Sequence, residues 1–171
     1  MGTDNVNWTI RAEEPADVGA ISEVVRSAFG DDETPCLVEL IRDRDESLVS
    51  LVALSDGKVI GHVMVSPITL AGRSDQFGGA APLSVVPLRQ RTGVGSALML
   101  AMIDACRALG LKGLFLLGSP AYYPRFGFTR SHIGNDYDAT DAFMNLSLEP
   151  GCIEALVGDA TYVSAFAESG A

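Results

Sequence analysis

The sequence predicts one domain of mixed α/β class, in which helices flank a central sheet that is mostly antiparallel. Two observations predict this fold. Segments whose apolar residues recur at helical spacing are interspersed with short segments rich in Val, Ile and Leu, and a tight turn joins two of the latter as a hairpin. The chain has 171 residues, of which 47% are hydrophobic and 20% charged, and this size and composition are typical of one globular domain with its own core.

The first half of the chain is expected to contain two helices and three strands. Pro15 lies at an early helical position, and apolar residues then recur at helical spacing as far as Phe29, where Gly30 interrupts the pattern. Residues 55–58 (Ser-Asp-Gly-Lys) form a turn between two strand-like runs, so these runs make a β-hairpin. The expected elements are a strand at 8–11, a helix at 15–29, a helix beginning at Thr34, and strands at 48–54 and 59–70.

Glycines divide the second half of the chain. Gly110 follows a long apolar helix and suits the position just past its end, where the backbone turns left-handed. Residues 113–117 are apolar throughout, which predicts a strand buried on both faces. The expected elements are a polar loop at 72–79, a strand at 80–86, a helix from Ser96 to Leu109, a strand at 113–117, a helical turn at 121–126, a strand beginning at Phe128 and a late strand at 142–148.

The charge of the chain restricts its partners. Acidic residues outnumber basic ones 22 to 12, a formal net charge of −10. This surplus repels phosphate backbones, so we expect no nucleic-acid partner. It suits cationic partners such as amines, and solubility alone is the alternative explanation for it. No stretch approaches the ~18 apolar residues of a membrane span, and the N-terminus lacks a signal-peptide pattern, so no membrane association is expected. The three cysteines have no paired spacing, which predicts no metal site, no disulfide framework and a cytoplasmic location.

The most informative segment joins the expected strand at 80–86 to the long helix. The turn Gly93-Val94-Gly95 lets several backbone N–H groups point at one spot, and the N-terminus of the following helix adds partial positive charge there. Together they predict an anion site, for which phosphate is the usual ligand, with Arg89 and Arg91 beside it. The pattern is not a Walker motif, which needs Gly-Lys-Ser/Thr, nor a dinucleotide fingerprint, because Leu98 stands where the third glycine belongs.

Two segments resemble motifs of the GNAT N-acetyltransferase superfamily. Gln90-x-x-Gly93-x-Gly95, after Leu-Ser-Val-Val-Pro at 83–87, resembles its acetyl-CoA motif. Tyr123-x-x-x-Gly127-Phe128, after Gly-Ser-Pro-Ala-Tyr at 118–122, resembles its Tyr-x-x-x-Gly-Phe segment in the form of a bacterial subgroup. The resemblance covers residues 8–148 and implies a single GNAT-like domain over 1–171, with 149–171 as a C-terminal extension. It also implies that the fourth and fifth strands splay apart to admit the cofactor.

The resemblance further implies roles for individual residues. The fourth strand presents backbone groups to the pantetheine arm and the thioester carbonyl, and the glycine turn holds the diphosphate of acetyl-CoA. Tyr123 falls on the family tyrosine that often protonates the departing CoA thiolate. The residues implied in cofactor binding are Ser84, Val85, Val86, Arg91, Thr92, Gly93, Val94, Gly95 and Ser96.

Transfer of an acetyl group to an amine by direct attack in a ternary complex makes three chemical demands. A lysine-type amine, with a pKa of about 10.4, must lose a proton; the oxyanion needs aimed N–H donors; and the thiolate needs a proton. Tyr123 is the candidate donor of a proton to the thiolate, and Tyr122 is the other candidate for this role. For both tyrosines the alternative is aromatic packing without a chemical role. For the whole chain, the alternatives are a non-catalytic acyl-CoA-binding module and a fold that binds another phosphate ligand.

The sequence leaves the general base and the acceptor open. The expected fourth strand carries no carboxylate, and a chain of water molecules is one substitute for a side-chain base. Small amines, aminoglycosides, protein N-termini and lysine side chains all remain open as acceptors, and so do oxygen and sulfur acceptors. Apolar segments at 143–148 and 160–166 are candidates for pairing across a homodimer. The side chains that are candidates for the base, each with a structural role as its alternative, are Asp31, Asp32, Glu33, His62, His132, Asp136 and Asp138.

Overall fold

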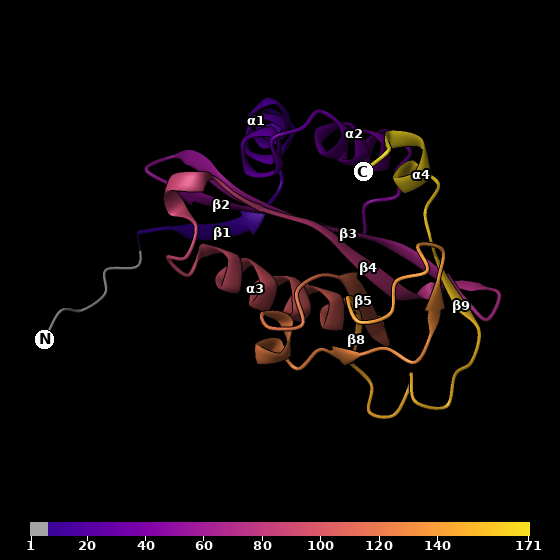
Figure 1. The fold of residues 1–171 in the computed structure, drawn as a ribbon. Helices are drawn as coiled ribbons and strands as arrows, with labels where there is room; N and C mark the ends of the chain where they lie inside the picture. The colour runs from indigo at the N-terminus through magenta and orange to yellow at the C-terminus, as the bar shows by residue number, and fades with distance from the viewer. Residues whose placement is uncertain (1–6) are drawn as a thin grey trace, which may run out of the picture.

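The computed structural model describes residues 7–171 (Figure 1). Residues 1–6 lie outside the described residues, and they belong to the N-terminal segment in which the sequence shows no signal-peptide pattern. Its strands are β1 (Thr9–Ala12), β2 (Val49–Ser55), β3 (Lys58–Leu70), β4 (Arg73–Val85), β5 (Gly113–Leu117), β6 (Thr129–Arg130), β7 (Gly134–Asn135), β8 (Phe143–Ser147) and β9 (Asp159–Tyr162). Its helices are α1 (Val18–Phe29), α2 (Glu33–Asp43), α3 (Val94–Ala108) and α4 (Ala165–Ser169), with short 3-10 turns η1 (Pro15–Asp17), η2 (Pro87–Arg89) and η3 (Tyr123–Phe126).

The strands form one nine-stranded sheet in the order β1-β2-β3-β4-β5-β8-β6, with β9 alongside β3 and β7 alongside β9. Within residues 7–171, β4–β5 and β7–β9 are parallel pairs and the other pairs are antiparallel. Helices α1, α2 and α4 lie over one face of the sheet, and α3 lies over the other (Figure 1). Each face of the sheet has its own apolar cluster beneath its helices. The predicted mixed α/β class with a mostly antiparallel sheet is confirmed.

The hairpin of β3 and β4 corrects one prediction. Residues 72–79 were expected to form a polar loop, but β4 already begins at Arg73, which pairs with Leu70. Ala71 and Gly72 make the tight turn, both with left-handed backbone (φ 52° and 74°), as a two-residue hairpin requires. The polar side chains of this segment lie on the exposed end of the hairpin, so their polarity reflects exposure to solvent and not a lack of strand pairing.

The parallel strands β4 and β5 separate soon after they meet. Residues 77–79 of β4 pair with 113–115 of β5, and beyond Gly79 no β4–β5 pair forms within the described residues. At this level the register between β3 and β4 also shifts, and Pro82, which has no N–H to donate, lies in the shifted stretch. The edge of β4 that faces β5 is therefore open from residue 80 to its end. The splay that the family resemblance implies is confirmed.

The C-terminal segment folds back onto the sheet. Ala160 and Tyr162 of β9 and Phe166 of α4 are buried in the same apolar cluster as α1 and α2. Strand β9 pairs with β3 and β7, and β8 pairs with β5 and β6. Both segments that were expected to pair across a homodimer thus have strand neighbours on two sides within their own chain. These contacts all lie within one chain, and the homodimer itself stays a prediction.

Replacement of Gly79 by alanine tests the packing of this segment. A Cβ on Gly79 would lie 2.8 Å from Cε1 of the Tyr162 ring, which is buried and cannot move aside. We expect a loss of about 1–3 kcal/mol in the free energy of unfolding, measured with urea. Gly19→Ala is the matched control, because nothing lies within 4 Å of its Cβ position in α1. A Gly79→Ala protein as stable as the parent would contradict the packing of β9 described here.

Candidate active site

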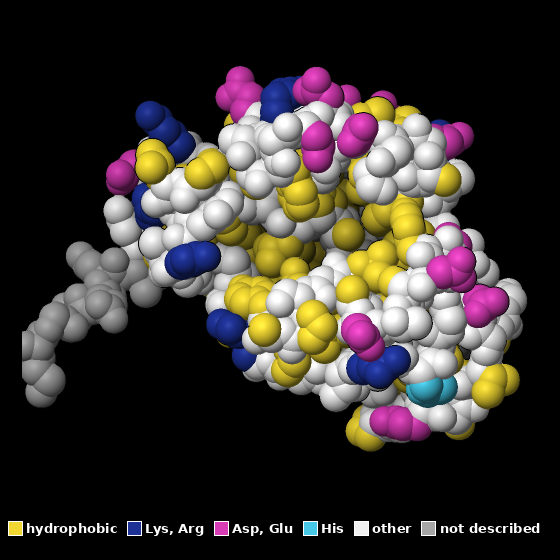
Figure 2. Space-filling view, viewed as in Figure 1, with side chains coloured by type: hydrophobic (Ala, Val, Ile, Leu, Met, Phe, Trp, Pro, Cys, Tyr) yellow, Lys and Arg dark blue, Asp and Glu magenta, His cyan; other side chains and the backbone are white. Residues whose placement is uncertain are grey.

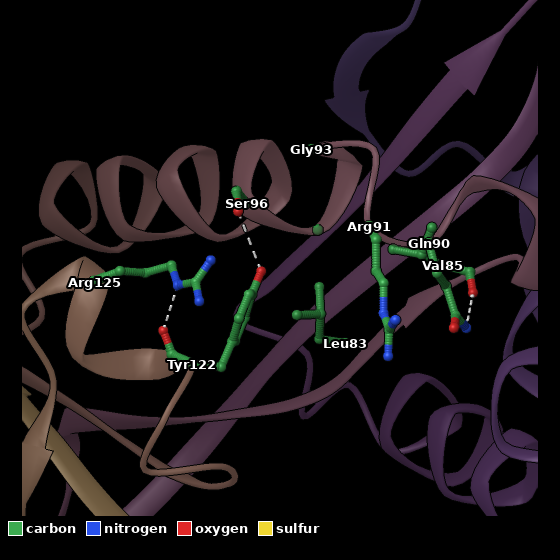
Figure 3. Close-up of a pocket in the computed structure, with 9 residues that line it drawn as sticks. Leu83, Val85, Gln90, Arg91, Gly93, Ser96, Tyr122 and Arg125 are labelled. Atoms are coloured by element: carbon green, nitrogen blue, oxygen red, sulfur yellow. Dashed lines mark hydrogen bonds between the residues drawn. The ribbon is translucent and has the colours of Figure 1, made fainter.

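A pocket lies where β4 leaves β5 and α3 begins (Figure 3). Its walls come from β4, from the turn that leads into α3, and from η3. Figure 2 shows a hollow on this face of the molecule, between the layer of α1 and α2 and the layer of α3, with hydrophobic side chains visible inside it. The residues that line the pocket are Leu83, Val85, Gln90, Arg91, Gly93, Gly95, Ser96, Tyr122 and Arg125.

Two side-chain hydrogen bonds hold the turn between β4 and α3. Gln90 Nε2 donates to the Val85 carbonyl oxygen at 3.0 Å and ties the turn to the end of β4. Thr92 Oγ1 donates to the Arg89 carbonyl oxygen at 2.5 Å and ties it to η2. These bonds fix the direction in which α3 leaves the sheet.

The turn places the N-terminus of α3 at the pocket. Arg91 and Gly93 are both left-handed, with φ of 61° and 100°. The first helical hydrogen bond runs from the Ala97 N–H to the Gly93 carbonyl at 3.0 Å, so the amides of residues 94–96 have no acceptor within the helix. Free amides with the helix dipole behind them have the chemistry of an anion site, and the anion site at this turn stays a prediction. Helix α3 begins at Val94, two residues earlier than expected.

Gly95 allows close contact between α3 and η3. A Cβ there would lie 3.3 Å from the Tyr122 hydroxyl oxygen, closer than most side chains tolerate. The same hydroxyl lies 3.3 Å from Ser96 Oγ, on the first turn of α3. Tyr122 therefore forms a wall of the pocket beside the anion site.

The predicted residues of β4 do not all face the pocket. Val85 lines it, together with Leu83, which the sequence did not single out. Ser84 is buried on the opposite face of β4, where it pairs in register with His62 of β3. The Val86 N–H donates to the Ile60 carbonyl at 2.9 Å and is therefore already used. Of the turn residues, Thr92 is exposed and Val94 is buried against the core, while the others of 91–96 line the pocket.

Tyr123 lies further along the splay. Its ring carbon Cζ, which carries the hydroxyl, is 3.1 Å from the position that a Cβ on Gly118 would take, just past the end of β5. The ring also packs edge-on against Tyr122 and Phe128, with centroids 5.0 and 6.2 Å away. Burial, and then the neighbouring Tyr122, raise the pKa of the Tyr123 hydroxyl, so it stays protonated near neutral pH. The two tyrosines thus lie at different places, Tyr122 by the anion site and Tyr123 by the end of β5.

Arg125, like Leu83, lines this pocket and was missed by sequence reasoning. Its guanidinium lies 4.4 Å from the centroid of the Tyr122 ring, and its Nε donates to the Tyr122 carbonyl at 2.8 Å. The quoted Tyr-x-x-x-Gly segment contains Arg125, but nothing in that pattern shows that η3 turns its side chain towards α3. Arg91 reaches the pocket from the turn, as the sequence predicts.

The acidic candidates for a general base lie away from the lining of the pocket. Asp31 Oδ1 accepts a 2.8 Å hydrogen bond from the Thr34 N–H, at the start of α2. Asp32 Oδ1 pairs with Arg26 Nε at 2.7 Å. These contacts give Asp31 and Asp32 structural roles. Glu33, Asp136 and Asp138 are exposed and do not line the pocket.

The two histidines also lie apart from the pocket. His62 is fully buried in β3, with Nε2 2.8 Å from Ser50 Oγ, and desolvation lowers its pKa to about 3. His132 is exposed, with Nε2 2.8 Å from the Leu156 carbonyl oxygen. Cys106, the buried cysteine of α3, has its pKa raised to about 12 by burial, so it is not a nucleophile poised for acyl transfer.

Two features are absent from residues 7–171. No helix there combines the length and the apolar character that crossing a membrane requires. The same part of the chain contains no group of three or more His, Cys, Asp or Glu side chains arranged to hold a metal ion.

The splayed parallel pair, with an amide-lined helix N-terminus beside it, defines the acyl-CoA N-acyltransferase fold. The chain belongs to the acetyltransferase (GNAT) family, whose profile matches residues 18–128. This membership confirms the family resemblance that the two sequence motifs carry.

Three similar proteins extend this finding. The uncharacterized N-acetyltransferase YjhQ of Escherichia coli K12 is 34% identical over 126 residues, which cover 71% of this chain and 70% of that protein. The crystal structure of E. coli YhbS in complex with CoA superposes with a TM-score of 0.91 at 30% identity and covers 98% of this chain and 96% of its own. A GNAT family acetyltransferase from Brucella melitensis in complex with acetyl-CoA gives a TM-score of 0.81 at 33% identity, over 93% and 97% of the two chains.

Proposed function

We propose that this protein transfers the acetyl group of acetyl-CoA to an amine by direct attack in a ternary complex. The observation that carries the proposal is the open edge of β4, which leads to the amides of residues 94–96. The diphosphate of the cofactor binds these amides, and the pantetheine arm runs along β4 past Leu83 and Val85. The structures of YhbS with CoA and of the Brucella protein with acetyl-CoA support this ligand.

In the proposed reaction the amine nitrogen attacks the thioester carbonyl carbon and a C–N bond forms. The oxyanion takes a hydrogen bond from an N–H on the open edge of β4, a contact worth roughly 3 kcal/mol in other acyl transfers. The C–S bond then breaks and the sulfur leaves with the electron pair as a thiolate. We assign protonation of that thiolate to Tyr123, which lies beside the end of β5 and keeps its own proton near neutral pH; the tyrosinate then regains a proton as the nitrogen of the new amide loses one.

The acceptor must lose a proton before it attacks. Only about one lysine-type amine in 2,500 is neutral at pH 7, which costs roughly 4–5 kcal/mol unless a base or desolvation helps. The residues that line the pocket include no carboxylate and no histidine. We therefore assign deprotonation to water in the hollow of Figure 2, whose upper rim over α1 and α2 carries acidic side chains that favour a cationic acceptor.

A pocket lining without a carboxylate or a histidine also favours a second candidate function, a non-catalytic acyl-CoA-binding module. An acceptor panel distinguishes the two functions. Small amines, aminoglycosides and peptides with a free N-terminus or lysine are incubated with acetyl-CoA, free thiol is measured, and cofactor binding is followed by calorimetry in parallel. We expect thiol release and an acetylated product with at least one acceptor class. Binding without release across the panel would support the module, and absence of binding would contradict both functions.

The tyrosines should affect different kinetic constants. Tyr123→Phe removes the proton donor and should lower kcat by about 10- to 100-fold, with the KM for acetyl-CoA nearly unchanged. Tyr122→Phe is the matched control, because it removes a neighbouring hydroxyl that lies 3.3 Å from Ser96 Oγ. It should raise the KM for acetyl-CoA a few-fold and leave kcat nearly intact. Steady-state kinetics with the best acceptor of the panel measures both. An unchanged kcat in Tyr123→Phe would remove Tyr123 from the proposed mechanism.

A further inference from the structure

The basic residues of this acidic protein are distributed unevenly. Of its 12 basic side chains, those that form ion pairs within residues 7–171 are Arg11, Arg26, Arg42, Arg44, Arg73, Arg107, Lys112 and Arg130. Those without an acidic partner in that part of the chain are Lys58, Arg89, Arg91 and Arg125. Arg91 and Arg125 line the pocket, and Arg89 lies in η2 just before the turn. Two positive charges without carboxylates therefore line the pocket that holds the proposed phosphate site, and a third, on Arg89, lies nearby with its Nη1 3.3 Å from Ser55 Oγ, although acids predominate over the whole chain.

Arg125 differs from the other two because it does not belong to the turn. It comes from η3, and in Figure 3 it lies across the pocket from Arg91, with Leu83 and Tyr122 between them. The Tyr122 ring and carbonyl hold its guanidinium through the stacking contact and through Nε. Its two Nη groups make no hydrogen bond within the described residues. A guanidinium held in this way offers a fixed fork of donors, which suits a phosphate.

Acetyl-CoA carries two kinds of phosphate, a diphosphate and a 3′-phosphomonoester. The amides of residues 94–96, with Arg89 and Arg91 beside them, provide for the diphosphate. The phosphomonoester bears a charge of about −1.5 to −2 at pH 7 and has no partner on that wall. We propose that Arg125 binds the 3′-phosphate and makes the pocket select acetyl-CoA over its dephosphorylated form. This inference rests on the proposed function, since it assigns a further residue to the same cofactor.

Binding of CoA and dephospho-CoA to the parent protein and to variants tests the inference. Isothermal titration gives Kd for both ligands, so the readout does not depend on an acceptor. Arg125→Ala should weaken CoA binding by about 10- to 100-fold and change dephospho-CoA binding by no more than about 2-fold. Arg125→Lys keeps the charge but not the forked guanidinium, so its affinity for CoA should lie between those of the parent protein and Arg125→Ala. Arg130→Ala is the matched control, because it removes the same charge from the nearby β6, where Arg130 pairs with Asp141.

The two ligands separate failure of the inference from failure of the proposed function. A parent protein that binds CoA more tightly than dephospho-CoA, with this preference lost in Arg125→Ala, supports the inference. If Arg125→Ala bound CoA and dephospho-CoA more weakly by the same factor, Arg125 would contact the diphosphate or support the fold, and the inference would be overturned. An Arg125→Ala protein that kept the parent's preference for CoA would overturn it as well. Parent protein that binds neither ligand would overturn the proposed function together with the inference. Circular dichroism of each variant shows that it is folded before titration.

Discussion

Gly93→Asp should abolish binding of acetyl-CoA. Gly93 precedes the first residue of α3, and a Cβ there meets the Trp8 ring at an ordinary 3.5 Å, so an aspartate fits without a steric clash. Because Gly93 lines the pocket, the carboxylate would place a negative charge close to the proposed diphosphate site. Two unit charges about 5 Å apart repel by roughly 3 kcal/mol at an effective dielectric constant of about 20. We therefore expect Kd to rise by about 100-fold or more, measured by calorimetry.

The control for this variant is Gly93→Asn, which has nearly the same shape and no charge. Both substitutions place a side chain on a backbone with φ of 100°, a conformation that costs non-glycine residues about 1–2 kcal/mol. Gly93→Asn therefore reports the strain alone, and the difference between the two variants reports the charge. Equal affinities for the two variants would contradict a diphosphate at this turn, even if both bound more weakly than the parent.

The turn before α3 and the β2–β3 hairpin were predictable because both depend on local sequence. The left-handed backbone at Gly93 and the turn at residues 55–58 require residue types that a single sequence displays. The splay of β4 and β5 is a long-range feature, and it was expected only because the family resemblance carries it. The class of the fold followed from the order of the predicted elements.

Other features depend on contacts between distant parts of the chain. Arg125 reaches the pocket because η3 packs against the start of α3 at Gly95, which no spacing within either segment encodes. Likewise, residues 73–76 are polar because their end of the hairpin is exposed, and only pairing with β3 shows that they are strand. The apolar stretch 160–166 indicates burial, but the sequence does not say whether a second chain or the same chain covers it. In this protein the same chain does so: β3 and β7 pair with the first part of the stretch, and its buried side chains pack into the apolar cluster of α1 and α2.

His62 should make the fold lose stability between about pH 6.5 and pH 4. The imidazole is fully buried, and desolvation lowers its pKa from 6.5 to about 3. Above pH 6.5 the histidine is neutral in both the folded and the unfolded state, so its contribution to stability is intact. Below that pH the unfolded chain takes up a proton that the folded chain excludes, and the free energy of unfolding falls by about 1.4 kcal/mol per pH unit until the folded pKa is reached. Urea unfolding at half-unit steps of pH should show a loss of roughly 3 kcal/mol over this range.

The chain supplies its own control, because His132 is its only other histidine and is exposed. His62→Gln keeps a polar side chain near Ser50 and should remove most of the slope, whereas His132→Gln should keep the slope of the parent. The carboxylate of Asp17 does not obscure this range. The hydrogen bond from Arg11 lowers its pKa below 3.8, so its contribution is lost only under more acidic conditions. If His62→Gln unfolds with the same pH dependence as the parent, the imidazole already binds its proton in the folded state, and the burial of His62 described here would be wrong.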